Sequence, residues 1–253
     1  MIKIKSLYAG YNKKAVIKNI SANIKDGEFV CVIGPNGSGK STLLKSLCSI
    51  IKPISGEIEV NGKSVAFMKR SERARLISYL QQENVSVNMT AGQFVLKGRY
   101  PHLGYPKHFS KIDEIKSEEA MKRLGILELS HIPVSSLSGG MKQSVYLAMA
   151  LCQDTKILLM DEPTTYLDIA NKIRIMKTLK DLSLEGKCVI CVIHDISLAL
   201  EFADRILLIK DGALVANTTP ELIATSSDFE SAFGVKISRI NEGCKSAYSF
   251  DLI

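Results

Sequence analysis

Hydrophobic and polar residues alternate along the first part of the chain, which predicts β structure over residues 2–33. Ile2–Tyr8 alternates regularly, Val16–Ile24 does so more loosely, and Phe29–Ile33 is apolar throughout. Alternation indicates a strand with one buried face, whereas an unbroken apolar run is typical of a strand covered on both faces. The same patterns predict three further elements: a β segment with an Asn-Gly turn at 55–63, a charged helix near 71–75 and a strand at 76–80.

A helical pattern replaces the β pattern from about residue 85. Helices are predicted over Thr90–Arg99 and Ser110–Leu124, the second with Ser110 and Asp113 as a capping box and Gly125 after its end. A third helix runs to about Cys152. Between the first two helices, 98–106 is rich in turn formers and aromatics, so an exposed loop is expected there.

The second half of the chain returns to apolar runs separated by helical stretches, as in parallel strands buried on both faces. Strands are expected at 156–161, 187–194 and 206–209, and helices at 169–184 and 196–202. Two short strands are expected in the tail, at 233–236 and 246–251. The predicted fold class is therefore α/β with a mostly parallel sheet.

Candidate chemistry begins where the apolar run at 29–33 ends. The next eight residues, 34–41, match the phosphate-binding pattern G-x-x-x-x-G-K-[ST], and a helical composition follows them. Glycines let backbone N–H groups approach a polyphosphate, Lys40 can reach the β- and γ-phosphates, and the Ser41 hydroxyl can bind Mg²⁺. The candidate ATP-binding residues are Gly34, Pro35, Asn36, Gly37, Ser38, Gly39, Lys40, Ser41 and Thr42.

Two acids follow the buried run that ends at Met160. At the carboxyl end of a parallel strand, Asp161 is expected to hold Mg²⁺ through its water shell and Glu162 to polarise an attacking water. His194 closes the next predicted strand and should reach the same edge of the sheet. From the pattern alone, a packed histidine at a strand end is an equal interpretation of His194.

Charge and cysteine content indicate which binding partners and which compartment to expect. The net charge is +7 and the basic residues form neither a tail nor a stripe, so we interpret them as solvated surface and expect no nucleic-acid partner. The six cysteines lack disulfide spacing, and Cys188 and Cys191 lie in one apolar run, which favours buried small hydrophobes in a reducing compartment. His102 and His108 lack metal-ligand partners at ligand spacing. Without a signal peptide or membrane-length apolar run, a soluble intracellular chain is expected.

Taken together, these motifs resemble the ATP-binding subunits of ABC transporters over essentially the whole chain. Besides the phosphate loop, the chain has the family's signature LSGGMKQ at 137–143, its acidic strand ILLMDEP at 157–163 and the segment TTYLD at 164–168. The departures are Met141-Lys142, where an acidic or Gln residue and Arg are more usual, and Tyr166, where Ala or His is common. None of these positions contacts phosphate.

The resemblance implies one ABC ATPase domain over 1–253: a phosphate-loop core with an antiparallel β subdomain (1–84 and 156–253) and an inserted helical subdomain (85–155). It implies ATP and Mg²⁺ as cofactors and a homodimer in the ATP state. It also assigns roles within one copy of the chain: Tyr11 stacks on adenine, Gln82 binds Mg²⁺ and couples the ATP site to the helical subdomain, and His194 is a switch histidine. Other residues act between copies: Asp168 signals to the partner copy, and the partner's ATP is contacted by Ser138, Gly139, Gly140 and Gln143. Alone, Tyr11 would be interpreted as a surface turn residue.

Within the family, GRYPHLG at 98–104 and the two tail strands resemble importer ATPases for iron-siderophore, haem and cobalamin. That implies two membrane permease subunits, a substrate-binding protein acting through them, and a place on the inner face of the membrane. A cytosolic ATPase of an iron–sulfur assembly scaffold is the main alternative. A DNA-acting ABC ATPase is disfavoured because the chain lacks coiled-coil heptads before its signature, and a simple kinase would not explain LSGGMKQ.

Overall fold

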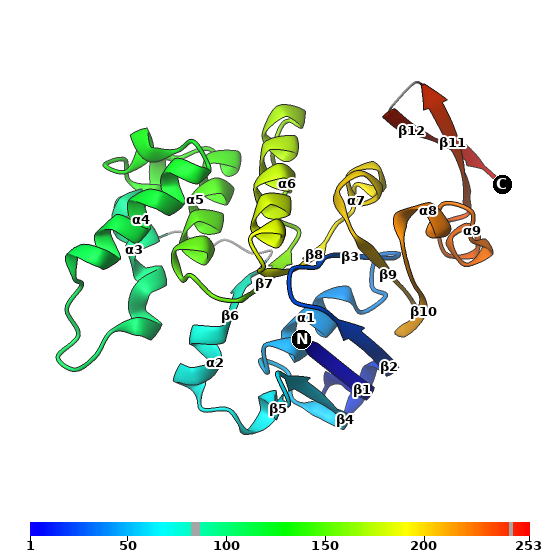
Figure 1. Cartoon of the computed structure of the whole chain (residues 1–253), viewed down its shortest axis with the longest axis horizontal. Coiled ribbons are helices and arrows are strands. Elements are labelled where there is room, and N and C mark those ends of the chain that lie inside the picture. The colour runs from blue at the N-terminus through cyan, green and yellow to red at the C-terminus, as the bar shows by residue number, and fades with distance from the viewer. Residues whose placement is uncertain (82–86, 243–244) are drawn as a thin grey trace.

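The computed structural model of the protein describes residues 1–81, 87–242 and 245–253. A six-stranded sheet forms its centre, with strand order β10-β9-β3-β8-β7-β6 (Figure 1). Neighbouring strands are parallel except for β10 and β9. The strands are β3 (Phe29–Ile33), β6 (Ile77–Leu80), β7 (Ile157–Asp161), β8 (Cys188–Val192), β9 (Arg205–Lys210) and β10 (Ala213–Thr218). The predicted α/β class with a mostly parallel sheet is confirmed.

A second, antiparallel sheet of order β2-β1-β4-β5 is built from the N-terminal alternating segments (Figure 1). Its strands are β1 (Ile2–Tyr11), β2 (Lys14–Ile24), β4 (Pro53–Val60) and β5 (Lys63–Ser64). Strands β4 and β5 meet at the predicted Asn-Gly turn, where Val60 pairs with Lys63. The short helices η1 (Val65–Phe67) and α2 (Arg70–Leu76) then lead into β6.

The central sheet separates two hydrophobic clusters, and β3 shows why its sequence is apolar throughout. Val30 and Val32 belong to the cluster shared with α1 (Lys40–Leu47) and the antiparallel sheet. Phe29, Cys31 and Ile33 belong to the other cluster. That cluster also contains side chains of α5 (Gly139–Cys152), α6 (Ile169–Leu184) and α7 (Ile196–Phe202). A strand in the middle of the sheet is therefore buried on both faces.

The cysteines follow the same alternation. Cys188 packs in the first cluster and Cys191 in the second, so residues three apart on β8 face opposite sides. Burial raises the pKa of the Cys188 thiol to about 12. These cysteines are buried and free, as predicted for small hydrophobic residues.

Residues 90–154, here called the helical block, lie at one end of the molecule (Figure 1). Helices α3, α4 and α5 pack on one another, and the rings of Phe94 and Tyr146 lie 4.6 Å apart in their core. Ser110 and Asp113 form the predicted capping box of α4. The block contains α3 (Ala91–Leu96), η2 (Lys97–His102), α4 (Lys111–Arg123), η3 (Leu127–Leu129), η4 (Val134–Ser136) and α5.

The prediction of an exposed loop at 98–106 is wrong for its first part. Lys97–His102 forms the 3₁₀ helix η2, and Gly98 and Arg99 are buried in it. The arginine is buried because Asp113 and the end of α5 supply partners for its charge and its N–H groups. Tyr100 of η2 and the continuation at 104–106 are exposed as expected.

The C-terminal tail forms the predicted pair of strands, β11 (Val235–Glu242) and β12 (Lys245–Leu252), as an antiparallel hairpin. The sequence prediction missed β10 and the helices α8 (Pro220–Ile223) and α9 (Ser227–Phe233), which connect the sheet to this hairpin (Figure 1). Both helices are short, so neither shows a sustained helical period.

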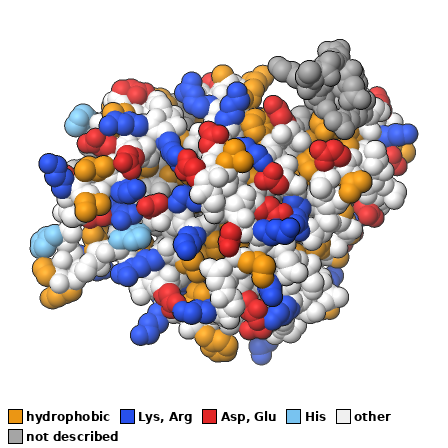
Figure 2. Space-filling view, viewed as in Figure 1, with side chains coloured by type: hydrophobic (Ala, Val, Ile, Leu, Met, Phe, Trp, Pro, Cys, Tyr) orange, Lys and Arg blue, Asp and Glu red, His pale blue; other side chains and the backbone are white. Residues whose placement is uncertain are grey.

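The surface carries both signs of charge. Figure 2 shows Lys and Arg side chains interspersed with Asp and Glu over the visible face. That distribution agrees with a solvated surface rather than a binding field of one sign. Among residues 1–81, 87–242 and 245–253, no helix has the length and apolar character needed to cross a bilayer.

Candidate nucleotide-binding site

The phosphate loop leaves the carboxyl end of β3 and enters α1, the strand–loop–helix context that its motif requires. Gly39 is the N-cap of α1 with a φ of 105°. A Cβ at Gly39 would lie 2.6 Å from Ile17 Cγ2, so the loop can pass β2 only with glycine here. Unpaired backbone N–H groups at the start of α1 create the positive end at which anions bind.

Lys40 is the first residue of α1 and is 6% exposed. Its ammonium donates to the carbonyl oxygens of Gly34 at 2.8 Å and Pro35 at 2.9 Å, so it lies over the loop rather than in solvent. Burial lowers the pKa of Lys40, and the nearby charges of Glu162 and Asp161 oppose that shift. The cation is therefore held at the loop, with both acids close enough to influence it.

Asp161 ends β7 and is 2% exposed. Its Oδ1 accepts a hydrogen bond from Ser41 Oγ at 3.0 Å, and its Oδ2 accepts one from Tyr79 OH at 3.1 Å. Burial raises the pKa of Asp161, while these two hydrogen bonds act in the opposite direction. A hydroxyl and a carboxylate side by side form an all-oxygen donor set, which suits Mg²⁺.

Tyr79 was not among the residues that the sequence singled out. It lies on β6, which is hydrogen-bonded to β7, and its hydroxyl reaches the carboxylate at the end of that strand. Burial raises the pKa of Tyr79, so the phenol keeps its proton and donates. Only the strand order, with β6 beside β7, makes a tyrosine at this position informative.

Glu162 is the residue after β7 and has left-handed backbone geometry, with φ of 56°. This conformation is uncommon for a residue with a Cβ and is a form of backbone strain found at functional sites. Its Oε1 lies 2.6 Å from His194 Nε2, and its Oε2 accepts a hydrogen bond from Thr165 Oγ1 at 3.2 Å. The carboxylate is thus oriented by a histidine from the next strand end and by a hydroxyl that the sequence analysis missed.

These groups meet in one cavity of about 600 Å³. Its lining combines the phosphate loop with the acid and the histidine that follow β7 and β8. The lining residues are Val16, Asn36, Gly37, Gly39, Lys40, Ser41, Thr42, Glu162 and His194. The sequence therefore placed the loop, Glu162 and His194 correctly at one edge of the sheet, while Val16 of β2 was not anticipated.

Tyr11, which the sequence also named, does not line this cavity. Tyr11 ends β1, is 50% exposed and pairs with Lys14 across the β1–β2 turn. Gln82 falls outside the described residues. His102 Nε2 lies 2.8 Å from the Gln153 carbonyl oxygen.

The signature residues line a different cavity, of about 770 Å³, together with Tyr166 and Asp168. Ser138 is the N-cap of α5, and its hydroxyl accepts a hydrogen bond from Met141 N–H at 3.3 Å. Ser138 and Gly139 are exposed, with Gly140 half-buried beside them. Asp168 caps α6 by accepting from Asn171 N–H at 2.8 Å.

Gln143 connects the signature helix to the first cavity. It is 1% exposed, and its amide donates to the Glu162 carbonyl oxygen at 3.3 Å. The first cavity therefore touches α5 through the backbone of Glu162, whereas the start of α5 opens onto its own cavity. The sequence analysis named both Gln143 and Glu162 but could not show that they are in contact.

The fold and the site together define a phosphate-loop nucleotide-binding protein. A family model described as ABC transporter matches residues 17–165. The chain is 36% identical over 238 residues to the ferric enterobactin transport ATP-binding protein FepC of Escherichia coli (strain K12), covering 93% of this chain and 88% of that protein. The chain belongs to the ABC transporter family as one of its ATP-binding proteins.

Solved structures give the same result for the fold. An ABC transporter described as metal-chelate type, in an inward-facing conformation, has a chain that superposes with a TM-score of 0.84 at 25% identity, over 98% of this chain and 96% of that chain. The ATP-binding cassette MJ0796, as a post-hydrolysis dimer bound to ADP and Pi, superposes with a TM-score of 0.78 at 30% identity, over 87% of this chain and 99% of that chain.

Proposed function

We propose that the chain is the ATP-hydrolysing subunit of an importer for iron-siderophore or related metal-chelate cargo such as haem or cobalamin. The observation that carries the ATPase part is the cavity in which Lys40, Ser41, Glu162 and His194 meet. The importer part rests on the FepC likeness and on the metal-chelate transporter fold, together with GRYPHLG at 98–104.

ATP binds with its phosphates against the loop at 34–42 and the positive end of α1. Lys40 exchanges its contacts with the Gly34 and Pro35 carbonyls for the β- and γ-phosphate oxygens. Ser41 and Asp161 would hold Mg²⁺, Asp161 through water, and the ion would neutralise phosphate charge. Gln82 is the further expected ligand, and Tyr11 at the end of β1 stacks on adenine.

Glu162 acts as the general base, taking the proton of the water that attacks the γ-phosphate. Its position next to His194 and Thr165 orients the carboxylate before the reaction, so the base does not have to be ordered during it. His194 Nε2 can donate to Glu162 in one state and to the γ-phosphate in another. That exchange would make it a sensor of the nucleotide.

Two copies of the chain complete two sites. The start of α5 offers the Ser138 hydroxyl and backbone N–H groups, an arrangement suited to phosphate, but it opens onto a cavity other than the one containing Lys40. In a head-to-tail dimer, Ser138–Gly140 and Gln143 of each copy serve the γ-phosphate held by the other, and Asp168 connects the two. The dimeric MJ0796 cassette supports this arrangement.

The dimer drives two permease subunits at the inner face of the membrane, and a substrate-binding protein delivers cargo to them. In this proposal the chain is one ABC ATPase domain in which 85–155 forms a helical subdomain inserted between 1–84 and 156–253. Gln82 lies where those parts join in the sequence. Its replacement would therefore reduce transport more than basal hydrolysis.

Affinity purification of the tagged chain from solubilised membranes tests the function. The expected result is a complex with two permease subunits whose Mg-ATP hydrolysis disappears in Glu162→Gln. Mass spectrometry would identify the permease and its binding protein, and the absorption spectrum of that binding protein would distinguish a ferric chelate from haem or cobalamin. Recovery only from the soluble fraction with iron–sulfur assembly proteins would contradict the importer.

A further inference from the structure

The C-terminal end of the signature helix α5 is capped by side chains from another segment. The last carbonyl groups of a helix lack partners within it and carry the negative end of its dipole. Here Arg99 Nη1 donates to the Cys152 carbonyl at 3.1 Å, and His102 Nε2 lies 2.8 Å from the Gln153 carbonyl. A carbonyl oxygen only accepts, so His102 carries its proton on Nε2. Both caps come from η2, the GRYPH segment.

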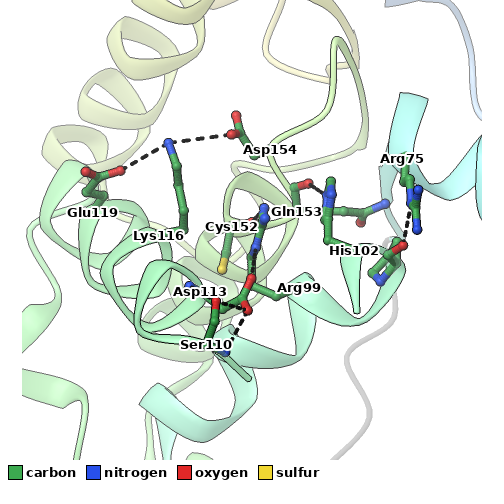
Figure 3. Close-up of polar contacts among 11 residues, drawn as sticks. Arg75, Arg99, His102, Ser110, Asp113, Lys116, Glu119, Cys152, Gln153 and Asp154 are labelled. Carbon is green, nitrogen blue, oxygen red and sulfur yellow. Dashed lines mark hydrogen bonds and ion pairs between the residues drawn. The ribbon is translucent and has the colours of Figure 1, made fainter. Parts of the chain in front are cut away.

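Gln153, at the end of α5, also caps the end of α2. Gln153 Nε2 donates to the Ala74 carbonyl at 2.6 Å and to the Ile77 carbonyl at 3.2 Å, at the end of α2. From α2, Arg75 Nε donates to the Pro101 carbonyl of η2 at 2.7 Å. The contacts close a ring from η2 to α5, from α5 to α2 and from α2 back to η2. Figure 3 shows the contacts of His102 with Gln153 and of Arg75 with η2.

The GRYPH segment is held firmly enough to act as one corner of this ring. Arg99 is 8% exposed and pairs with Asp113 of α4 at 2.9 Å (Figure 3). A Cβ at Gly98 would lie 2.4 Å from the Met149 carbonyl, so η2 packs directly on the backbone of α5. Just beyond the segment, Tyr105 is 99% exposed. A partner that contacts Tyr105 would therefore bind three residues from a corner that these contacts hold in place.

The other two corners lead to the two parts of the nucleotide site. Helix α5 has 14 residues, so it transmits the position of its C-terminal end over about 21 Å to Ser138 and Gly139 at its start. Helix α2 continues directly into β6, where Tyr79 holds Asp161. The ring thus connects the stretch before the exposed Tyr105 to the signature through α5 and to the Asp161 carboxylate through α2 and β6.

We propose that Arg75, His102 and Gln153 are positioning residues that fix the signature helix to strand β6, and that the nucleotide site and the exposed Tyr105 beyond the GRYPH segment communicate through this ring. The inference rests on the proposed ATP-driven function and specifies its internal connection. Coupling between two sites is reciprocal. If a partner at Tyr105 changes the affinity for ATP, bound ATP changes the affinity for that partner by the same factor, and we expect the connecting GRYPH segment to register it.

Hydrogen exchange on the full-length chain measures this connection, with Glu162→Gln as background so that Mg-ATP persists. We expect ATP to slow exchange at 34–42 and 138–144, and also to slow it about fivefold at 97–103. His102→Phe, which keeps a ring but loses the donor, should leave the first two effects intact and abolish the third. His102→Gln, whose amide replaces Nε2 as donor, should restore it.

Two further variants keep the test informative. His108→Phe changes an exposed histidine six residues beyond His102 and should behave as the background. Gln153→Met preserves the side-chain volume but removes the donor to α2, so it should give the same result as His102→Phe. It therefore keeps the test available if His102→Phe does not fold. The inference is overturned, and the proposed function is not, if ATP protects 97–103 as strongly in Gln153→Met or His102→Phe as in the background. The same holds if ATP does not protect 97–103 in the background. No ATP protection at 34–42 in any variant overturns the proposed function and the inference with it.

Discussion

Helices α1 and α5 each begin at a cavity and each offer free backbone N–H groups there, but their surroundings differ. At the start of α1, Lys40 is buried over the loop, and Glu162 and His194 line the same cavity; we call this the enclosed half because its cation is buried. The start of α5 is open: Ser138 and Gly139 are exposed. The first cavity holds the phosphate loop with Lys40 and Glu162, whereas the second holds the Ser138 hydroxyl and the N–H groups of α5 beside Glu128, Asp168 and Arg174.

The difference indicates that one chain holds two unlike halves of a site. An enclosed half with a cation and a base can bind a triphosphate by itself, but an open half cannot compete with water for one. Helix α4 shows a third solution, since Asp113 of the chain itself fills its N-terminal end. Phosphate from a second copy would do for α5 what Asp113 does for α4.

The largest effect is expected at the enclosed half. Lys40→Ala removes the buried cation, a charge-assisted contact worth about 1.5–3 kcal/mol, so ATP affinity should fall about 10- to 100-fold and turnover should be lost. Isothermal titration with Mg-ATP and a phosphate-release assay would measure both. Lys45→Ala, one turn and a half further along α1, is the matched control. Unchanged hydrolysis in Lys40→Ala would contradict the assignment of the loop.

The open half should behave differently when it is changed. Ser138→Arg places a bulky cation at the start of α5, so turnover should fall about 100-fold, while the affinity of the single chain for ATP should stay within about twofold because its own loop is untouched. The same two assays apply. An equal loss of affinity and turnover would show that Ser138 belongs to the enclosed half and would remove the distinction.

A smaller effect is expected for the base of the nucleotide. Tyr11→Ala should weaken ATP binding about fivefold, and Tyr11→Phe should be tolerated, because stacking uses the ring and is worth about 1 kcal/mol. Inorganic tripolyphosphate, which lacks adenine, should bind all three proteins alike. If alanine, phenylalanine and tyrosine give the same ATP affinity, Tyr11 is a surface residue of the β1–β2 turn.

The Asp113–Arg99 pair, whose arginine caps the end of α5, should affect stability rather than catalysis. Hydrogen bonds from Ser110, together with Arg99, lower the pKa of Asp113 from its ordinary 3.8 to about 2. A lowered carboxyl pKa stabilises the fold above about pH 4, and this contribution is lost as pH falls through about 2. Urea unfolding should therefore show Asp113→Asn less stable by about 2 kcal/mol at pH 7, with a difference that shrinks below pH 4. A difference independent of pH would mean that the carboxylate charge contributes nothing.

Local patterns were sufficient for much of the fold and site. The phosphate loop, the acids after β7 and the histidine after β8 could be predicted because each follows a buried parallel strand, and such strand ends meet at one edge. The burial of Arg99 could not be predicted, since its partners are Asp113 on α4 and a carbonyl at the end of α5. Tyr79 and Thr165 became informative only when the strand order and the turn after Glu162 were known.

The central claim is that ATP joins the enclosed half of one chain to the open half of another. Light scattering on Glu162→Gln with saturating Mg-ATP tests it most directly, because this substitution keeps the carboxylate's shape but removes the base that would consume the bridging γ-phosphate. The account predicts a dimer with Mg-ATP, a monomer without it, and a monomer with it when Ser138→Arg is added. A Glu162→Gln chain that stays monomeric at saturating Mg-ATP, or a dimer unaffected by Ser138→Arg, would contradict it.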